Sequence, residues 1–252
     1  MREALVVVSM VVGLAIFGCS SPRTSVDAPP ADAAAPATAV GIAFEHGASP
    51  EALALVSAAE AQVGKTLHYD PAYVKLDYPG GDVALERGVC TDVVIRAMRE
   101  LDVDLQVELH QDMSANFDDY PRNWGLARPD SNIDHRRVPN LQTYFRRTGK
   151  SLVVSGRPED YWPGDIVSWD VQGRPHSGIV STKPAPSGER YCIVHNIGAG
   201  TRVEDRLFDF RITGHYRPFS DASLTLPSGS GQVACRMRPP PSALARYMRS
   251  SA

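Results

Sequence analysis

The chain has 252 residues, of which 43% are hydrophobic and 22% are charged, and its formal net charge is −3 at pH 7. This composition is that of an ordinary soluble globular domain and excludes collagen-like, coiled-coil and wholly disordered chains. The nearly balanced charge argues against a dedicated nucleic-acid-binding protein, which is usually basic. Four cysteines are too few for a disulfide-built scaffold, and a single apolar run excludes a polytopic membrane protein.

The N-terminal segment has the pattern of a secretory signal. Residues 4–18 read ALVVVSMVVGLAIFG, an apolar run that is shorter than the ~20 residues needed to span a bilayer. The run ends at Ile16-Phe17-Gly18-Cys19, which resembles the lipobox of bacterial lipoproteins. The resemblance implies a signal peptide over residues 1–18 and lipid attachment at Cys19. It implies a bacterial cell-envelope protein in the periplasm, anchored to the outer membrane. An ordinary signal or an uncleaved anchor is the alternative.

Two further segments have compositions that do not support a hydrophobic core. Residues 19–47 are dominated by Ala, Pro, Ser and Thr, which predicts a flexible tether. Residues 221–252 contain PSGSG and three consecutive prolines, which predicts a disordered tail. The folded domain is therefore expected over residues 48–220.

Two helices are predicted in the first half of this domain. Residues 49–65 begin with Ser49 as a cap and Pro50 in the first turn, and Gly64 can end the helix. The second helix covers residues 88–102 and follows a Tyr- and Gly-rich loop over residues 67–82. The side chains expected to be buried are Leu53, Val56, Ala59 and Val63 in the first helix, and Val93, Val94, Ala97, Met98 and Leu101 in the second, with Arg96, Arg99 and Glu100 facing water.

The second half combines a helix with short strands. Residues 103–109 can form a short strand, and residues 114–137 form a long polar loop of a length that is often functional. A helix is predicted over residues 138–149, ending at Gly149. Strands are predicted over residues 164–170, 176–182 and 191–197, which are rich in β-branched and aromatic side chains. Helices followed by antiparallel strands indicate an α+β domain.

Cys90 and two histidines form the strongest candidate site. Cys90 lies at the start of the second helix, where unpaired N–H groups and the helix dipole favour a thiolate. A nucleophilic cysteine needs a base, and His176 and His195 lie on two of the predicted strands. If these strands are neighbours and meet the start of the helix, the three side chains converge as nucleophile, base and base-orienting group.

Four segments in this order resemble the NlpC-type papain-like cysteine peptidases of bacterial cell walls and the related amidases. These segments are GVCTDVVIRAM, WPGDIVSW, HSGIVS and YCIVHNIG. From about residue 69 to residue 218 the chain more closely resembles an uncharacterised bacterial domain family usually placed in that superfamily. That likeness rests on YDPAYVKLDYPGGD, GVCTDVVIRA and IDHRRVPNLQTYF. The resemblance implies an α+β papain-like domain in which the Cys-bearing helix packs on a small antiparallel sheet.

The resemblance also implies roles for individual residues. Cys90 would be the nucleophile, His176 the general base and His195 the residue that orients the base, with Asn196 as the alternative. A tyrosine upstream of the cysteine often contacts substrate in such enzymes, and Tyr69, Tyr73 and Tyr78 are matches. Two departures stand out: Thr91 and Asp92 follow the cysteine in place of a small serine, and the region after the helix is long. The Asp92 carboxylate would raise the pKa of the thiol.

The implied function is amide-bond hydrolysis through a thioester, with peptidoglycan stem peptides as substrate and no cofactor. The substrate class rests on the resemblance and on the export signal. An acyltransferase or transamidase could use the same three residues. A non-catalytic lipoprotein that binds the cell wall is the other alternative, and the chemistry of Cys90 distinguishes it from an enzyme.

Several other residues have competing interpretations. Arg136 and Arg137 either receive a substrate carboxylate or form a charge pair beside a helix. Asp165 is expected to be a structural turn acceptor. Cys192 and Cys235 either pair in an oxidising compartment or remain free thiols. No metal site is predicted, because the spacing of the remaining candidates matches no standard ligand pattern. Those candidates are His110, Asp112, Asp134 and His135.

Overall fold

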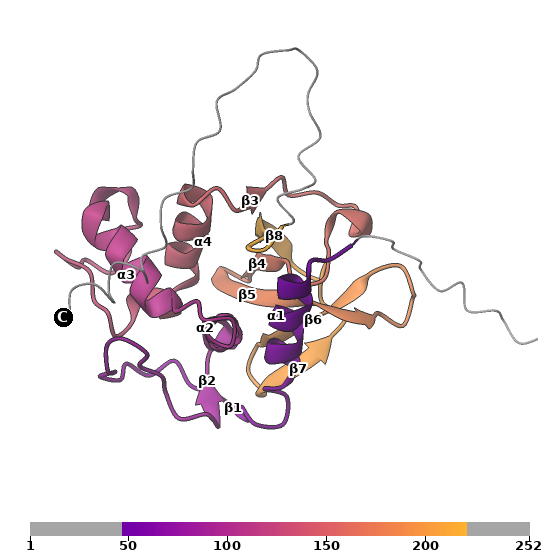
Figure 1. The fold of residues 1–252 in the computed structure, drawn as a ribbon, viewed down its shortest axis with the longest axis horizontal. Coiled ribbons are helices and arrows are strands. Elements are labelled where there is room, and N and C mark those ends of the chain that lie inside the picture. Colours follow the sequence, from indigo (N-terminus) through magenta and orange to yellow (C-terminus); the bar gives the residue numbers. More distant parts are fainter. Residues whose placement is uncertain (1–46, 221–252) are drawn as a thin grey trace, which may run out of the picture. The chain divides into compact units, whose positions relative to one another are not determined.

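The structure is a computed structural model and describes residues 47–220 (Figure 1). The predicted signal peptide, Cys19 and the C-terminal tail lie outside the described residues. The described α-helices are α1 (Pro50–Glu60), α2 (Cys90–Arg99), α3 (Leu105–Ala115) and α4 (Val138–Arg147), and short 3₁₀ helices are η1 (Phe117–Asp119), η2 (Asp134–Arg136) and η3 (Pro158–Asp160).

The described residues form one large sheet and one small one. The large sheet is antiparallel, and its strands follow the order β3 (Ser151–Leu152), β8 (Arg211–Tyr216), β4 (Ile166–Val171), β5 (Arg174–Pro184), β6 (Tyr191–Asn196) and β7 (Thr201–Glu204). The small sheet pairs β1 (His68–Tyr69) with β2 (Arg87–Gly88) in parallel. The three strands predicted from the sequence are therefore confirmed as β4, β5 and β6.

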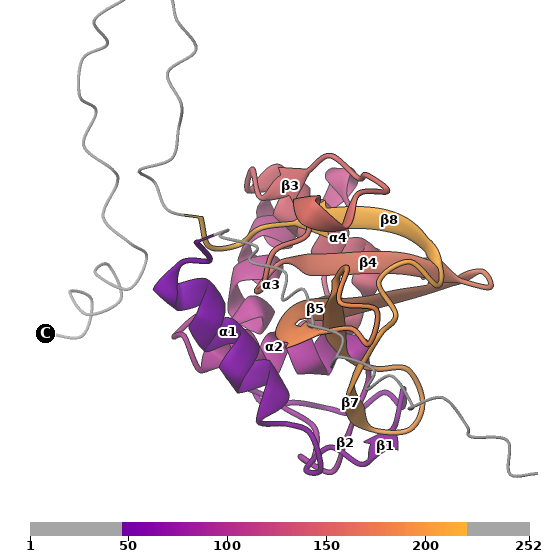
Figure 2. The same ribbon diagram turned by 90° about the vertical axis from the view of Figure 1, so that its right-hand side faces the viewer.

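The large sheet separates two hydrophobic layers, because successive side chains of a strand point to opposite faces. On one face Ile166, Ile179 and Val194 pack with side chains of the helices, and Figures 1 and 2 show α1 and α2 against β5. On the other face Trp169 and Ile193 belong to a second buried cluster. The predicted fold class is confirmed: the domain is α+β, and the Cys-bearing helix packs on the antiparallel sheet, which has six strands.

The helix predicted over residues 88–102 is confirmed as α2, which begins at Cys90 and is shorter than predicted at both ends. Its first turn is held by Asp92, whose Oδ2 accepts a hydrogen bond from the Val89 N–H at 2.6 Å. This contact satisfies one of the N–H groups that a helix start leaves without an intrahelical partner. The prediction of burial is confirmed for Val93, Val94, Ala97 and Met98.

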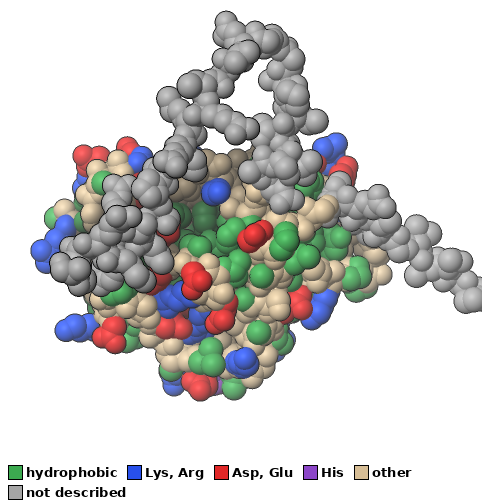
Figure 3. All heavy atoms as spheres, in the orientation of Figure 1, with side chains coloured by type: hydrophobic (Ala, Val, Ile, Leu, Met, Phe, Trp, Pro, Cys, Tyr) green, Lys and Arg blue, Asp and Glu red, His purple; other side chains and the backbone are tan. Residues whose placement is uncertain are grey.

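The predicted exposure of Arg96 is wrong, because its side chain is only 8% exposed. Its guanidinium donates to both carboxylate oxygens of Asp82 at 2.7 and 3.1 Å and to the Arg87 carbonyl at 3.0 Å. The segment between Asp82 and Arg87 covers the side of α2 that carries Arg96, whereas the helical pattern alone predicts that this side is exposed to solvent. Figure 3 shows acidic and basic side chains next to one another on one face of the molecule.

Helix α1 has the predicted cap: Ser49 Oγ accepts from the Ala52 N–H at 3.2 Å, and Pro50 opens the helix. The helix ends at Glu60, earlier than predicted, and turns lead to Gly64. The predicted burial of Leu53 and Val63 is wrong, since they are 45% and 44% exposed. Many alanines in this helix leave its apolar stripe poorly defined, and the stripe that packs on the core is Ala52, Leu55, Val56 and Ala59.

The strand predicted over residues 103–109 is wrong, because this segment enters α3. Asp104 caps the helix by accepting from the Gln106 N–H at 3.0 Å. Leu105, Leu109 and Met113 are buried at a spacing of four residues, which places them on one helical face. The helix predicted over residues 138–149 is confirmed as α4, with Gly149 just beyond its end at φ +72°. Within the described residues, no helix has the length and apolar character that crossing a membrane requires.

Candidate active site

Cys90 lies at the edge of a cavity of about 400 Å³. The thiol-bearing residue is buried and opens helix α2, so its backbone N–H belongs to the first turn and is free of an intrahelical partner. The cavity gathers residues from three distant parts of the chain. These include Tyr69, Tyr73, Trp124, Arg136, Arg137 and Pro175.

The Cys90 sulfur lies against strand β5 at Ser177. Burial raises the pKa of the Cys90 thiol above its ordinary value, and the negative charge of Asp92 adds to the rise. Polar interactions of the sulfur with Ser177 and with the Thr91 backbone lower the pKa and offset part of the increase. Burial therefore raises the pKa of Cys90 by more than the helix start is expected to lower it, and Cys90 rests as a thiol.

The two predicted histidines are direct hydrogen-bond partners. His176 on β5 and His195 on β6 are both buried, and Nε2 of His176 lies 2.8 Å from Nδ1 of His195. His176 directly precedes Ser177, the residue that contacts the Cys90 sulfur, and its ring packs beside Trp169. Its hydrogen-bond partner is His195, and within the described residues no hydrogen bond joins His176 to Cys90. Burial, together with the charge of His195, lowers the pKa of His176 to about 3, so this imidazole is neutral near pH 7. A neutral imidazole can accept a proton, which a general base must do.

A third group, which the sequence interpretation missed, continues this chain. Glu204 on β7 lies with its Oε2 3.0 Å from Nε2 of His195. Burial lowers the pKa of His195, and the Glu204 carboxylate opposes that shift. The only sequence signal for Glu204 is its place in a short polar–apolar segment, TRVE, and the pairing of β7 with β6 is needed to bring the two together.

Asn196, the alternative orienting residue, has other partners. Its amide nitrogen donates to the Gly88 carbonyl at 3.0 Å and to the His68 carbonyl at 3.3 Å. Its amide oxygen accepts from the Gly198 N–H. Because neighbouring residues of a strand point to opposite faces, Asn196 ties β6 to the small sheet while His195 faces His176.

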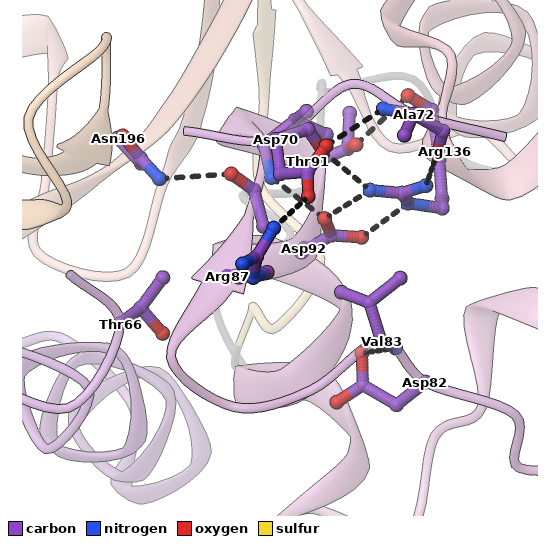
Figure 4. Close-up of polar contacts among 12 residues, drawn as sticks. Thr66, Asp70, Ala72, Asp82, Val83, Arg87, Thr91, Asp92, Arg136 and Asn196 are labelled. Carbon is purple, nitrogen blue, oxygen red and sulfur yellow. Dashed lines mark hydrogen bonds and ion pairs between the residues drawn. The ribbon is translucent and has the colours of Figure 1, made fainter. Parts of the chain in front are cut away.

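Arg136 connects the first turn of α2 to the 70–72 segment. Its Nε and Nη2 donate to the two carboxylate oxygens of Asp92, each at 2.9 Å, and both side chains are at most 3% exposed (Figure 4). Its Nη1 and Nη2 also donate to the Ala72 and Asp70 carbonyls at 3.1 and 3.2 Å. Thr91 completes the junction, because its hydroxyl donates to the Arg136 carbonyl at 2.9 Å. These bonds occupy the guanidinium, so Arg136 is not placed to receive a substrate carboxylate.

Arg137 is differently placed from Arg136. Its guanidinium carbon lies 4.0 Å from the centre of the Trp124 ring, and Nη1 donates to Asp134 at 2.9 Å. Among the described residues, Asp134 is its hydrogen-bond partner, so further N–H donors remain for a ligand in the cavity. Of the two arginines predicted to receive a carboxylate, Arg137 is the one whose geometry allows it.

Two of the three candidate tyrosines line the cavity. Burial raises the pKa of Tyr69 to about 12, so its phenol keeps its proton and can donate to a ligand. The Tyr73 hydroxyl donates to Asp130 Oδ2 at 3.0 Å. Tyr78 instead packs edge-on against His110, with ring centres 5.2 Å apart.

The remaining sequence candidates have local partners. Asp165 accepts from the Trp162 N–H and pairs with His215 and Arg217, which is a structural arrangement. Within residues 47–220 no group of three or more His, Cys, Asp or Glu side chains is placed to hold a metal. Cys192 is a buried free thiol whose Sγ lies 3.6 Å from the Pro184 carbonyl, and its suggested partner Cys235 lies outside the described residues.

Residues 56–218 match a protein family described as "Domain of unknown function (DUF1287)". A curated relative, "Uncharacterized protein YijF" of Escherichia coli (strain K12), is 57% identical over 168 residues, which cover 66% of this chain and 82% of the relative. Two solved structures, NlpC2 and NlpC1 of Trichomonas vaginalis, are similar at 14% and 12% identity, with TM-scores of 0.37 and 0.35. The similarity covers 69% and 65% of this chain and 49% and 43% of those chains, so the chain spans less than half of their length. With most of its length matched by the family and a relative of high identity, the chain belongs to the DUF1287 family.

Proposed function

We propose that this protein is an exported thiol hydrolase that cleaves amide bonds in peptidoglycan stem peptides, with Cys90 as the nucleophile. One observation carries the proposal: His176, which is buried and bonded to His195 at 2.8 Å, directly precedes on β5 the residue that contacts the Cys90 sulfur. A cysteine at a helix start, a neutral imidazole and a second group that orients it form the arrangement that thiol-based acyl transfer requires.

The protonation states define the first step. Cys90 rests as a thiol and His176 rests as a neutral imidazole, so no ion pair is stored between them. His176 therefore removes the thiol proton as the sulfur attacks the scissile carbonyl, and then delivers that proton to the leaving amine. The acyl group remains on Cys90 as a thioester until water, deprotonated by His176, releases it.

The cavity supports a peptide substrate that carries a free carboxylate. Its walls include the aromatic rings of Tyr69, Tyr73 and Trp124, and Arg137 supplies the positive charge with donors suited to a carboxylate. The backbone N–H of Cys90 is available to stabilise the oxyanion that forms during attack. The stem-peptide assignment itself is supported by the motif resemblance and by the export signal of the sequence. The same signal supports a periplasmic location with a lipid on Cys19.

Digestion of purified peptidoglycan tests the proposal. Residues 20–252 would be compared with a Cys90→Ala variant, and soluble fragments would be identified by mass spectrometry. A Cys192→Ala variant is the matched control, because it removes the other buried thiol of the described domain. We expect the same new fragments from the native and control proteins and none from the Cys90 variant. Binding to the wall without release of fragments would instead support a non-catalytic wall-binding protein.

A further inference from the structure

Three strands place a carboxylate and two imidazoles in one hydrogen-bonded line. Glu204 on β7 is 3.0 Å from Nε2 of His195 on β6, whose Nδ1 is 2.8 Å from Nε2 of His176 on β5. Both histidines are buried, whereas the Glu204 side chain is 26% exposed at the outer end of the line. Trp169 packs beside His176 with ring centres 5.8 Å apart, which restricts the imidazole to this orientation.

The chemistry of these groups permits one arrangement of protons when Glu204 is a carboxylate. A carboxylate accepts hydrogen bonds and does not donate them, so Nε2 of His195 must carry its hydrogen. A neutral imidazole carries one hydrogen, so Nδ1 of His195 is then an acceptor. Nε2 of His176 must therefore donate to it, and Nδ1 of His176 is left without a hydrogen.

Without the carboxylate, the hydrogen bond between the two histidines can have the opposite donor and acceptor, while the same two nitrogens stay in contact. His195 would then donate from Nδ1 to Nε2 of His176, and His176 would carry its hydrogen on Nδ1. In that form Nδ1 cannot take a proton from a thiol. The direction of the hydrogen bond between the two histidines therefore decides whether Nδ1 of His176, the nitrogen that is not bonded to His195, can act as a base.

We propose that Glu204 is a positioning residue that sets the tautomers of both histidines and leaves Nδ1 of His176 as the proton acceptor for Cys90. The assignment of the acceptor rests on the proposed function, whereas the tautomers are a property of the folded protein alone. Arg206 lies beside this carboxylate, with its Nε 3.9 Å from Glu204 Oε2, and helps to keep it at the end of the line.

The test uses ¹⁵N-labelled protein of residues 20–252 and long-range ¹H–¹⁵N NMR spectra, which distinguish protonated from unprotonated imidazole nitrogens. In the native protein we expect hydrogen on Nε2 of both histidines. Glu204→Gln keeps the shape of the side chain, but its amide can donate as well as accept, so we expect a mixed or reversed pattern. Glu189→Gln is the control, because it removes an equal charge from an exposed position and leaves the three-residue line untouched.

Hydrolysis measured on the same proteins separates this inference from the proposed function. We expect Glu204→Gln to lower kcat by roughly 10- to 100-fold with little change in KM, since the wrong tautomer impairs the base rather than binding. Hydrogen on Nδ1 of native His176, or unchanged tautomers in Glu204→Gln, would overturn the role of Glu204 even if the protein hydrolyses peptides. Expected tautomer changes in a protein without hydrolytic activity would uphold the tautomer assignment and overturn the thiol hydrolase function.

Discussion

Replacing Arg136 with methionine removes one half of the buried ion pair that joins the 70–72 segment to the first turn of α2. The Asp92 carboxylate would lose two hydrogen bonds of 2.9 Å at a position that is 3% exposed. Removing one partner of a buried pair costs about 3–5 kcal/mol, because the other charge remains buried without compensation. With a urea m-value of about 2 kcal/mol per M, the midpoint of unfolding should fall by about 2 M at constant m.

A double-mutant cycle locates the origin of this loss. Asp92→Asn in the Arg136→Met background removes the stranded charge and retains an oxygen for the Val89 N–H. We expect the double variant to be more stable than Arg136→Met alone, with a coupling energy on the order of 2 kcal/mol. Arg157→Met is the control, because Arg157 is 68% exposed and its ion pair with Asp160 should contribute less than about 1 kcal/mol. Equal losses in the buried and exposed variants, or strictly additive losses in the cycle, would refute the reasoning.

Three other substitutions have defined outcomes. Gly178→Ala would place a methyl carbon 2.6 Å from Ile193 Cγ2, so we expect the free energy of unfolding, measured with urea, to fall by about 1–3 kcal/mol. Gly156→Ala has open space around it and should be nearly neutral, and similar losses in the two variants would contradict the close packing. Burial lowers the pKa of His135 to about 4, so the unfolded chain binds its proton more tightly and stability should decline by about 2–3 kcal/mol as the pH falls from 6.5 to 4. His135→Gln should remove that part of the decline, and an unchanged pH dependence of the urea midpoint would count against it. Arg137→Gln should raise KM about 10-fold for a peptide with a free carboxylate at nearly constant kcat, and an equal effect on the amidated peptide would argue against carboxylate binding.

Local signals in the sequence are sufficient to predict the elements that carry Cys90, His176 and His195. The helix predicted over residues 88–102, observed as Cys90–Arg99, and the three strands over residues 164–197 are predicted as the right elements, because apolar periodicity and Gly/Pro boundaries specify such elements locally. Segment 103–109 was assigned to the wrong element, since its leucines at 105 and 109 fit both a strand and a helix. The capping role of Asp104 is the signal that favours the helix.

Long-range pairing accounts for what the sequence did not reveal. Arg96 and Arg136 look like exposed charges in a linear pattern, and only the folded chain supplies their buried partners Asp82 and Asp92. Glu204 is likewise an ordinary strand residue until β7 pairs with β6 and places it beside His195. Strand order and register, which decide these contacts, have no local signature in the sequence.

Trapping of an acyl-enzyme tests the central claim most directly. Native protein would be mixed with stem peptides released from peptidoglycan, quenched in acid within the time of one turnover, and digested for peptide mass spectrometry. The account predicts an acyl group on the Cys90 peptide that hydroxylamine removes, that is absent from Cys90→Ala, and that is greatly reduced in His176→Ala. Hydrolysis that persists in Cys90→Ala, or native protein that forms neither adduct nor product, would contradict it.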